Sequence, residues 1–328
     1  MNLEAVLKNF GKKKILVIGD LILDRYIWGK VERISPEAPV PIVDVTEDSY
    51  MLGGAANVAT NIASLGGHAT VAGVVGKDRA ADVLRGLLKA KGMDFALFED
   101  KRPTTVKTRV IAHNQQVVRF DTEDKSKING RVLKDLLLFL KRAVPEHDAV
   151  IISDYKKGVI TSALIKETLR LTGKKKFVAV DPKVGHFHLY KGVSIITPNL
   201  GEASEGSGIK ITDEKTLIKA GRTLMKKLKC SAVLITMGNQ GMCLFEKDGV
   251  ARIPTFAKKV YDVSGAGDTV IAVFSLTYAS GASLLDSAVI ANHAAGIVVG
   301  EVGTATVRPE ELLKSLRLQA KQPITKLK

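Results

Sequence analysis

Short, continuously apolar segments alternate with longer amphipathic segments along most of the chain. The apolar segments are rich in Val, Ile and Leu and predict buried strands at residues 14–20, 69–76, 148–154, 176–181, 193–199 and 231–237. The amphipathic segments predict helices at residues 55–67, 78–92, 161–173 and 212–229. Strands that are apolar on both faces and separated by helices are typical of a mainly parallel sheet with helices on both faces. We therefore predict a doubly wound α/β fold.

Two segments interrupt this alternation and have the period-two pattern of exposed strands. They lie at about residues 33–52 and 104–123, and the second is expected to fold back on itself at 113–116 as a hairpin. We predict that they are lid insertions, forming a small β-sheet that covers a site within a single domain over residues 1–328. The alternative is a dimerisation flap, and one sheet can serve both purposes, so we expect a homodimer through the lid. After Pro309 we expect one last helix and a frayed, basic end.

The chain carries 49 Lys and Arg residues against 34 Asp and Glu residues, a net charge of +15. Such a charge suits either nucleic acid or an anionic small substrate. No basic stripe interleaved with aromatic residues occurs, so we expect no nucleic-acid partner. Cys230 and Cys243 form no C-x-x-C pair, and neither a signal peptide nor an apolar run of membrane-spanning length is visible. We therefore expect no disulfide framework, no membrane partner and a cytoplasmic location.

A glycine-rich turn precedes an apolar helix in the segment YDVSGAGDTVIA, residues 261–272. Ordinary helix capping accounts for one polar residue there. It does not account for Asp262, Ser264, two glycines and Asp268 together. Successive amides of a glycine turn at a helix N-terminus form a site for a phosphate or a developing negative charge. A carboxylate in that site repels a resting anion, so we expect Asp268 to act as a base on a hydroxyl that attacks the anion.

Polar residues collect where the predicted strands end, which is the edge at which open parallel sheets bind ligands. These residues are Asp20, Asp24, Asp154, Asp181, Lys183, Asn199, Glu202, Thr236 and Gly238. Capping of the following helices explains part of the set. Asn199 and Glu202 offer oxygen atoms that suit Mg²⁺, a metal that phosphoryl transfer needs. Gly53 and Gly54 precede a helix that carries Asn57, which suits the close approach of a sugar.

Several nucleotide-binding and hydrolase motifs are missing from the sequence. No G-x-x-x-x-G-K-[ST] occurs, which excludes a P-loop NTPase, and neither the catalytic loop nor the D-F-G of protein kinases is present. No G-x-G-x-x-G follows the first strand and no G-x-S-x-G exists, which disfavours a dinucleotide-binding fold and an α/β-hydrolase.

Three segments together resemble one known family, the ribokinase-like (PfkB-type) carbohydrate kinases, over roughly residues 14–310; they are GGAANVATNIASLGG, NLGE and DVSGAGDTVIAVF. Within that family, GDLILDRYIWGKVERISPEAPVPIV, SDYKKGV and ITPNLGEA are similar to kinases of a phosphorylated heptose. The resemblance implies ATP-dependent phosphorylation of D-glycero-β-D-manno-heptose 7-phosphate at its anomeric C1 hydroxyl, for lipopolysaccharide core synthesis. It implies a stand-alone kinase or the kinase domain of a fusion with an adenylyltransferase. The alternatives are another sugar or nucleoside kinase of the family and a catalytically silent binding protein of the same fold.

The resemblance also implies roles for individual residues. Asp268 would be the catalytic base, and the amides of Gly265, Ala266 and Gly267 would form the anion hole. The ATP and Mg²⁺ side would comprise Asn199, Glu202, Lys183, Thr236, Gly238, Gly241 and Asn292. The sugar side would comprise Asp20, Asp24, Gly53, Gly54 and Asn57. Asp262, Ser264 and the loop that contains Gly303 resemble the monovalent-cation site of the family, which would hold K⁺.

A substrate that already carries a phosphate needs cations at the far end of its pocket, because a buried phosphate without a partner is strongly disfavoured. The candidates are Arg33, Lys107, Arg109, Arg119, Lys156 and Lys157. Arginine matches a phosphate better than lysine does, so the lid arginines rank first. We expect most of the set to be solvated and only a few members to touch the substrate.

Overall fold

The computed structural model describes residues 3–113, 115–257, 260–301, 303, 305–318 and 324–327. Its central sheet contains β1 (Lys14–Gly19), β4 (His68–Val75), β5 (Asp94–Glu99), β8 (Ala149–Ser153), β9 (Phe177–Asp181), β10 (Ile195–Ile196), β11 (Ala232–Thr236), β12 (Met242–Glu246), β13 (Gly249–Ile253) and β14 (Thr325–Leu327). Among the described residues the strand order is β14-β13-β12-β11-β10-β9-β8-β1-β4-β5. Pairing is parallel from β5 to β11 and antiparallel from β11 to β14. The mainly parallel sheet predicted from the sequence is confirmed.

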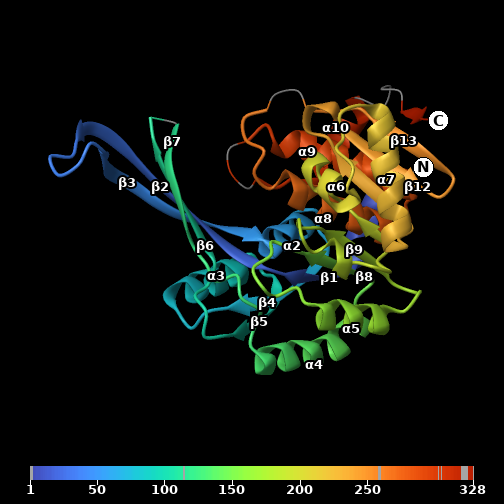
Figure 1. The fold of residues 1–328 in the computed structure, drawn as a ribbon, viewed down its shortest axis with the longest axis horizontal. Coiled ribbons are helices and arrows are strands. Elements are labelled where there is room, and N and C mark those ends of the chain that lie inside the picture. Colours follow the sequence, from blue (N-terminus) through green and yellow to red (C-terminus); the bar gives the residue numbers. More distant parts are fainter. Residues whose placement is uncertain are drawn as a thin grey trace.

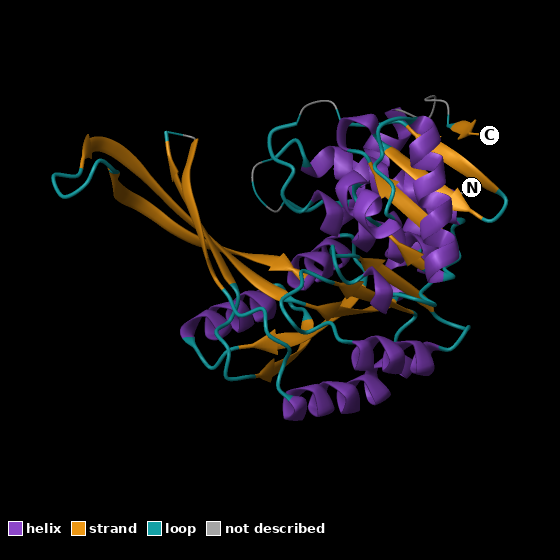
Figure 2. Cartoon of the chain, viewed as in Figure 1, coloured by secondary structure: helices purple, strands orange, loops and turns teal. Residues whose placement is uncertain are grey.

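Helices cover both faces of this sheet (Figures 1 and 2). One face packs against α1 (Leu3–Lys8), α2 (Ala55–Ser64), α3 (Arg79–Ala90), α8 (Ala266–Ala279), α9 (Leu284–Val298) and α10 (Pro309–Leu318). The other face packs against α4 (Gly130–Glu146), α5 (Ser162–Thr172), α6 (Leu200–Ser207) and α7 (Glu214–Leu228). Short 3-10 turns lie at η1 (Phe10–Lys12), η2 (Phe187–Leu189) and η3 (Gly238–Gln240). The doubly wound arrangement explains why inner strands such as β1, β8 and β11 are almost wholly apolar.

Strand β1 shows this two-sided burial directly. Ile15 and Val17 enter the core on the side of α2 and α8, whereas Leu16 and Ile18 enter the core on the side of α4 and α5. Successive side chains of a strand point to opposite faces, so a strand covered on both sides needs apolar residues throughout. All four side chains are fully buried.

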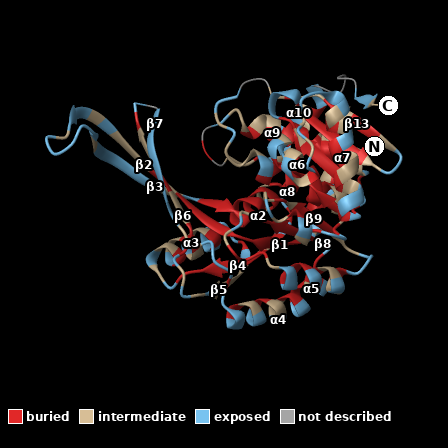
Figure 3. Ribbon diagram, viewed as in Figure 1, coloured by how far each residue is buried: buried red, intermediate tan, exposed pale blue. Residues whose placement is uncertain are grey.

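A second sheet projects from the body as a lid (Figure 1). It contains β2 (Leu21–Ile34), β3 (Pro41–Gly54), β6 (Val106–Ala112) and β7 (Gln115–Thr122), in the order β3-β2-β6-β7. The predicted hairpin is present, because β6 and β7 pair antiparallel with Ala112 opposite Gln115. The first lid segment starts at Leu21, earlier than the expected boundary near residue 33, because β2 continues from the end of β1. The outer part of the lid is exposed (Figure 3).

The described part of the C-terminal tail departs from its expected form, while residues 319–323 and 328 lie outside the described residues. Helix α10 is present, but Thr325–Leu327 are not frayed: they form β14 and pair antiparallel with Val250–Arg252 of β13. An edge strand offers unpaired backbone groups, so a short tail of alternating residues can add to it. Within the described part of the chain, no helix is both long and apolar enough to cross a bilayer.

Candidate active site

The glycine-rich turn leads directly into α8. Gly265 is the N-cap residue and has a left-handed φ of 80°, a conformation that a residue with a side chain rarely adopts. A Cβ added at Gly267 would meet no heavy atom within 4 Å, so the space beside this amide is open. The turn therefore presents the amides of Gly265 and Gly267 at a helix N-terminus, as an anion hole requires, whereas the Ala266 amide, also expected there, donates to the Val263 carbonyl at 3.2 Å.

Asp268 lies in the first turn of α8 and is only 3% exposed. Its Oδ2 accepts a hydrogen bond from Asn57 Nδ2 at 2.8 Å, and its Oδ1 accepts one from the Tyr155 hydroxyl at 2.8 Å. Burial raises the pKa of Asp268 to about 6, and these two hydrogen bonds oppose the rise. A carboxylate with a pKa near neutrality is suited to general-base catalysis. The geometry thus brings together Asp268 and Asn57, both predicted site residues, with Tyr155, which sequence reasoning missed.

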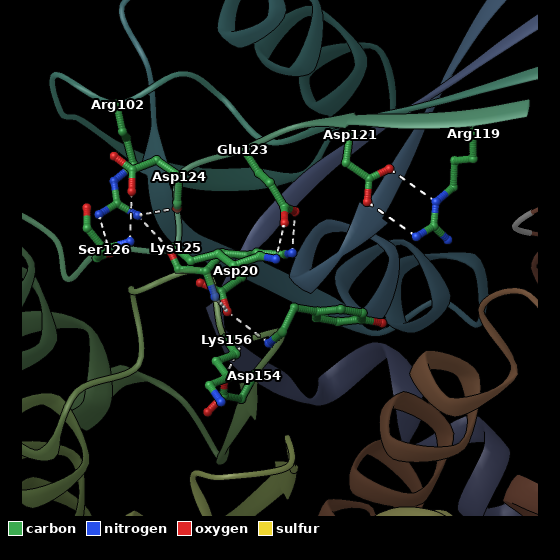
Figure 4. Close-up of polar contacts among 12 residues, drawn as sticks. Asp20, Arg102, Arg119, Asp121, Glu123, Asp124, Lys125, Ser126, Asp154 and Lys156 are labelled. Atoms are coloured by element: carbon green, nitrogen blue, oxygen red, sulfur yellow. Dashed lines mark hydrogen bonds and ion pairs between the residues drawn. The ribbon is translucent and has the colours of Figure 1, made fainter.

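Tyr155 belongs to the loop that follows β8, and Asp20 holds this loop (Figure 4). The Asp20 carboxylate accepts hydrogen bonds from the backbone amides of Tyr155, Lys157 and Val159 at 2.8, 3.0 and 3.2 Å. Burial and the charge of Asp154 raise the pKa of Asp20 to about 6, although the three amides oppose this. Asp20, expected on the sugar side, therefore fixes the loop that carries Tyr155.

Asp24 is the second carboxylate of the segment and faces the base of the lid. It lies in β2, is buried, and pairs with Arg109 of β6 at 2.5 Å. A Cβ at Gly53 would collide with the Asp24 carboxylate, and one at Gly54, which has a φ of 57°, would collide with the Asp20 carbonyl. Both glycines are therefore required for β3 to approach these acids closely. The two acids expected on the sugar side therefore differ: Asp24 has its carboxylate beside the base of the lid, whereas that of Asp20 binds the loop after β8.

The basic residues expected to bind a substrate phosphate do not all lie near this site. Arg33 is in β2, nine residues beyond Asp24, which corresponds to about 30 Å along a strand, and it is exposed. It cannot contact a sugar held at Asp24 of its own chain, so for this chain's own site the prediction is corrected. Arg119 is half-exposed and pairs with Asp121 on the same lid strand.

Three other cations gather at the base of the lid. The Nζ of Lys107 lies 5.2 Å from the centroid of the Tyr155 ring. Burial lowers the pKa of Lys107, and the charges of Lys157 and Arg109 lower it further, against the opposing effect of Asp24. Arg109 pairs with Asp24, and Lys157 pairs with Glu123, but Lys107 has no ion pair among the described residues. Of these three cations, Lys107 is therefore the one whose charge no acid of the described residues already pairs with.

Four of the seven residues expected on the ATP and Mg²⁺ side line one cavity of about 510 Å³, whereas Asn199, Glu202 and Lys183 are not part of its lining. Its lining includes Thr236, Gly238, Gly241, Asn292, Ala266 and Gly267, so the cavity ends at the turn that precedes Asp268. Asn292 donates to the carbonyl of Pro254 at 2.6 Å. Gly241 has a φ of 85°, and a Cβ there would collide with the carbonyl of Ile253. The size suits a nucleotide base and sugar, and the position would direct their phosphates toward the glycine turn.

Asn199 and Glu202 form a capping box at the start of α6. Asn199 Oδ1 accepts from the Glu202 amide at 2.9 Å, and Glu202 Oε2 accepts from the Asn199 amide at 3.1 Å. The other oxygen of Glu202 faces Lys183 Nζ at 3.3 Å. Burial and the charges of Asp268 and Glu202 raise the pKa of Asp181 well above its usual value. Acids therefore crowd this edge, yet the described residues contain no group of three or more potential metal ligands of the His, Cys, Asp and Glu types.

The expected monovalent-cation residues lie together on the other side of the turn. Asp262 accepts hydrogen bonds from the amides of Ser264 at 2.8 Å and Gly303 at 3.0 Å. Burial alone would raise the pKa of Asp262, but these hydrogen bonds more than offset it, and its pKa lies below the usual value. Val302 and Thr304 of the expected loop lie outside the described residues.

Comparisons with known proteins agree with this geometry. Residues 12–311 match the family described as pfkB family carbohydrate kinase. A relative named bifunctional protein HldE, from Geobacter metallireducens, is 44% identical over the whole of this chain, which spans 68% of that relative's length.

Two solved structures share the fold. The first is phosphofructokinase-2 from Escherichia coli in complex with potassium, with a TM-score of 0.80 and 20% identity; the match covers 94% of this chain and 100% of that one. The second is Arabidopsis thaliana ribokinase complexed with ribose and ATP, with a TM-score of 0.74 and 19% identity; the match covers 93% of this chain and 99% of that one. This chain belongs to the pfkB family of carbohydrate kinases and is an ATP-dependent sugar kinase.

Proposed function

We propose that this kinase transfers the γ-phosphate of ATP to the anomeric C1 hydroxyl of D-glycero-β-D-manno-heptose 7-phosphate. The observation that carries the proposal is the position of Lys107, which has no ion pair within the described part of the chain. It lies at the lid base beside Arg109 and Lys157 and against Tyr155, which itself contacts Asp268. A sugar whose reacting hydroxyl lies at Asp268 would extend its phosphate toward these cations. The similarity of three sequence segments to heptose phosphate kinases supports the choice of sugar. The test is a panel of sugars and nucleosides assayed with purified protein, with the products identified by phosphorus NMR.

Asp268 acts as the general base in this proposal. It takes the proton of the C1 hydroxyl while the hydroxyl oxygen forms its bond to the γ-phosphorus. The bond between that phosphorus and the β,γ-bridging oxygen breaks, and ADP leaves with the electron pair. The amides of Gly265 and Gly267 face the negative charge on the transferring group, as electrostatic catalysis requires. Asp24 is placed to hold a second hydroxyl of the sugar.

Mg²⁺ and a monovalent cation complete the proposed site. Mg²⁺, when bound, neutralises charge on the ATP phosphates. Glu202 is the acid that we propose for it, with Asn199 beside it. Mg²⁺ keeps several water ligands and needs few protein oxygens, so one carboxylate with an amide neighbour fits its chemistry. For the monovalent cation we propose K⁺ beside Asp262, Ser264 and Gly303, where a carboxylate and the backbone of two loops meet.

Glu202→Gln is expected to raise the Mg²⁺ concentration needed for half-maximal activity, because it removes one negative charge from the metal side while keeping an acceptor for the Asn199 amide. Activity of the wild type is expected to be higher in K⁺ than in Na⁺, and Glu202→Gln should preserve that ratio. Rates measured over a matrix of Mg²⁺ concentrations in the two salts test both ions at once. An unchanged dependence of the rate on Mg²⁺ concentration in Glu202→Gln would show that Glu202 does not bind the metal. Equal wild-type rates in the two salts would contradict a selective K⁺ site.

We also propose that two copies of the chain associate through the lid. Strands β3 and β7 are the open edges of the lid sheet. They expose Val45, Val117, Val118 and Phe120, which are 40–60% exposed. Exposed apolar residues on an open edge favour pairing with another sheet, and a second copy supplies a matching one. Sedimentation velocity is expected to give twice the chain mass of 35.3 kDa, shifted toward the monomer by Phe120→Glu. A monomeric wild type would contradict the proposal.

A further inference from the structure

Tyr155 connects the catalytic carboxylate to the lid and to the loop after β8. Its hydroxyl donates to Asp268 Oδ1 at 2.8 Å, and its backbone amide donates to Asp20 Oδ2 at 2.8 Å. Lys107 of the lid strand β6 covers its ring, with the Nζ 5.2 Å from the ring centroid. Tyr155 is therefore held at three points: the backbone, the ring and the hydroxyl.

We propose that Tyr155 is a positioning residue for phosphoryl transfer, whose hydroxyl holds the Asp268 carboxylate in its ionised form and aims a free lone pair at the attacking sugar hydroxyl. This inference rests on the proposed role of Asp268 as the general base. Asn57 holds Oδ2 and Tyr155 holds Oδ1, so the carboxylate cannot rotate without losing both hydrogen bonds. Each carboxylate oxygen has two lone pairs, so the fixed carboxylate still has acceptor capacity for the proton of the substrate.

The hydroxyl of Tyr155 is suited to this task because it stays protonated. Burial and the charge of Asp268 raise the pKa of Tyr155 well above its usual value of 10. Over the pH range in which Asp268 titrates, Tyr155 is therefore a donor and not a competing base. A donor to the ionised form of an acid lowers the pKa of that acid, which opposes the effect of burial on Asp268.

Other ionisable groups also face Asp268, and they come from several elements. The charge of Asp24 on β2 raises its pKa, and the charge of Lys107 on β6 lowers it. Asp181 at the end of β9 interacts with it electrostatically as well. These groups act through space, whereas Asn57 of α2 and Tyr155 contact the carboxylate directly. Removal of the Tyr155 hydroxyl alone leaves all the through-space groups in place.

Tyr155→Phe is the test, because the ring keeps its contact with Lys107 and the backbone keeps its hydrogen bond to Asp20. A hydrogen bond to a charged group contributes enough free energy to move the pKa of the acid by about one to two units. The acidic limb of the pH–rate profile is therefore expected to shift upward by about one to two pH units. Below the limb the variant should be about 10- to 100-fold slower than the wild type, and at higher pH it should recover most of the rate.

Tyr190→Phe is the matched control. Tyr190 is also a buried tyrosine, and its hydroxyl donates to a different buried carboxylate, that of Asp154, at 2.7 Å. It is expected to leave the acidic limb unmoved. The substrate phosphate titrates in the same pH range in all variants, so it cannot create a difference between them. ATP binding, measured by calorimetry, should be equal in the three proteins.

The outcomes separate this inference from the proposed base. An upward shift of the limb in Tyr155→Phe, but not in Tyr190→Phe, supports the positioning role. A Tyr155→Phe profile with the wild-type limb, whether lowered at every pH or unchanged, would overturn it and leave Tyr155 with a packing role only. If Asp268→Asn is inactive in either case, the base assignment stands independently of Tyr155. If Asp268→Asn is fully active, Asp268 is not the general base, and the positioning role of Tyr155 fails with it.

Discussion

Asp268→Asn is expected to lower the turnover number by about 10²–10⁴-fold, the range over which general-base catalysis typically contributes. Asparagine keeps the size of the side chain but cannot accept the proton of the sugar hydroxyl. The rate is measured with saturating ATP and sugar, so that a change in affinity does not disguise the effect. The wild-type rate should rise with pH through a limb near 6, because only the ionised form of Asp268, whose pKa is raised to about 6, is a base. The asparagine variant should lose that limb.

The variant is expected to fold, because its amide can satisfy both existing partners. The amide oxygen can accept from Asn57 Nδ2, and the amide nitrogen can donate to the Tyr155 hydroxyl, which is also an acceptor. A melting temperature and an ATP affinity close to those of the wild type would serve as the control. If turnover stays near the wild-type value, Asp268 is an ordinary residue of the first turn of α8, and the glycine turn needs another explanation.

The strands of the main sheet can be predicted from the local pattern of apolar and polar residues, but the first strand of the lid cannot. The inner strands β1, β8 and β11 each lie in one environment along almost their whole length, so their apolar runs are recognisable. Strand β2 changes environment midway: Leu21–Asp24 are buried against the body, and Glu32–Ile34 are exposed at the far end. No single period describes such a strand. The position of Arg33 was misjudged for the same reason, since its distance from the site depends on how far the lid projects.

The contacts of the site depend on topology that no local pattern contains. Asn57 and Asp268 are 211 residues apart, and Tyr155 and Asp268 are 113 residues apart. Asn57 and Asp268 could each be predicted from the sequence as a residue near the start of a helix, but the sequence does not show that they touch. The order of β1, β8 and β9 in the sheet brings them together with Tyr155. Tyr155 was missed although it follows Asp154 at the end of a buried strand, which was a usable signal. Asn199 and Glu202 have the three-residue spacing of a capping box, which sequence alone could have predicted.

The substrate phosphate gives the second large expected effect. Lys107→Met is expected to lower kcat/KM for heptose 7-phosphate by about 10- to 150-fold, because a hydrogen bond to a charged group is worth about 1.5–3 kcal/mol. Lys107 is favoured over the arginines ranked first from sequence, since Arg109 already pairs with Asp24 and Lys107 has no ion pair among the described residues. Methionine keeps an unbranched chain over the Tyr155 ring and removes only the charge. The KM for ATP should be nearly unchanged.

The comparison of two sugars makes this prediction specific. The wild type is expected to prefer heptose 7-phosphate strongly over unphosphorylated heptose. At a pH well above 6, where Asp268 is ionised in both proteins, Lys107→Met should reduce that preference while leaving the slow rate with unphosphorylated heptose almost unaltered. Lys30→Met removes the same charge from the exposed part of β2, about 20 Å along the strand from Asp24, and should change neither rate. Equal losses for both sugars in Lys107→Met would mean that Lys107 supports Tyr155 or the sugar body and not the phosphate. Phosphorus NMR of the wild-type product should show one new anomeric phosphate beside the original one, and preferred turnover of a neutral sugar or nucleoside would overturn the proposed substrate.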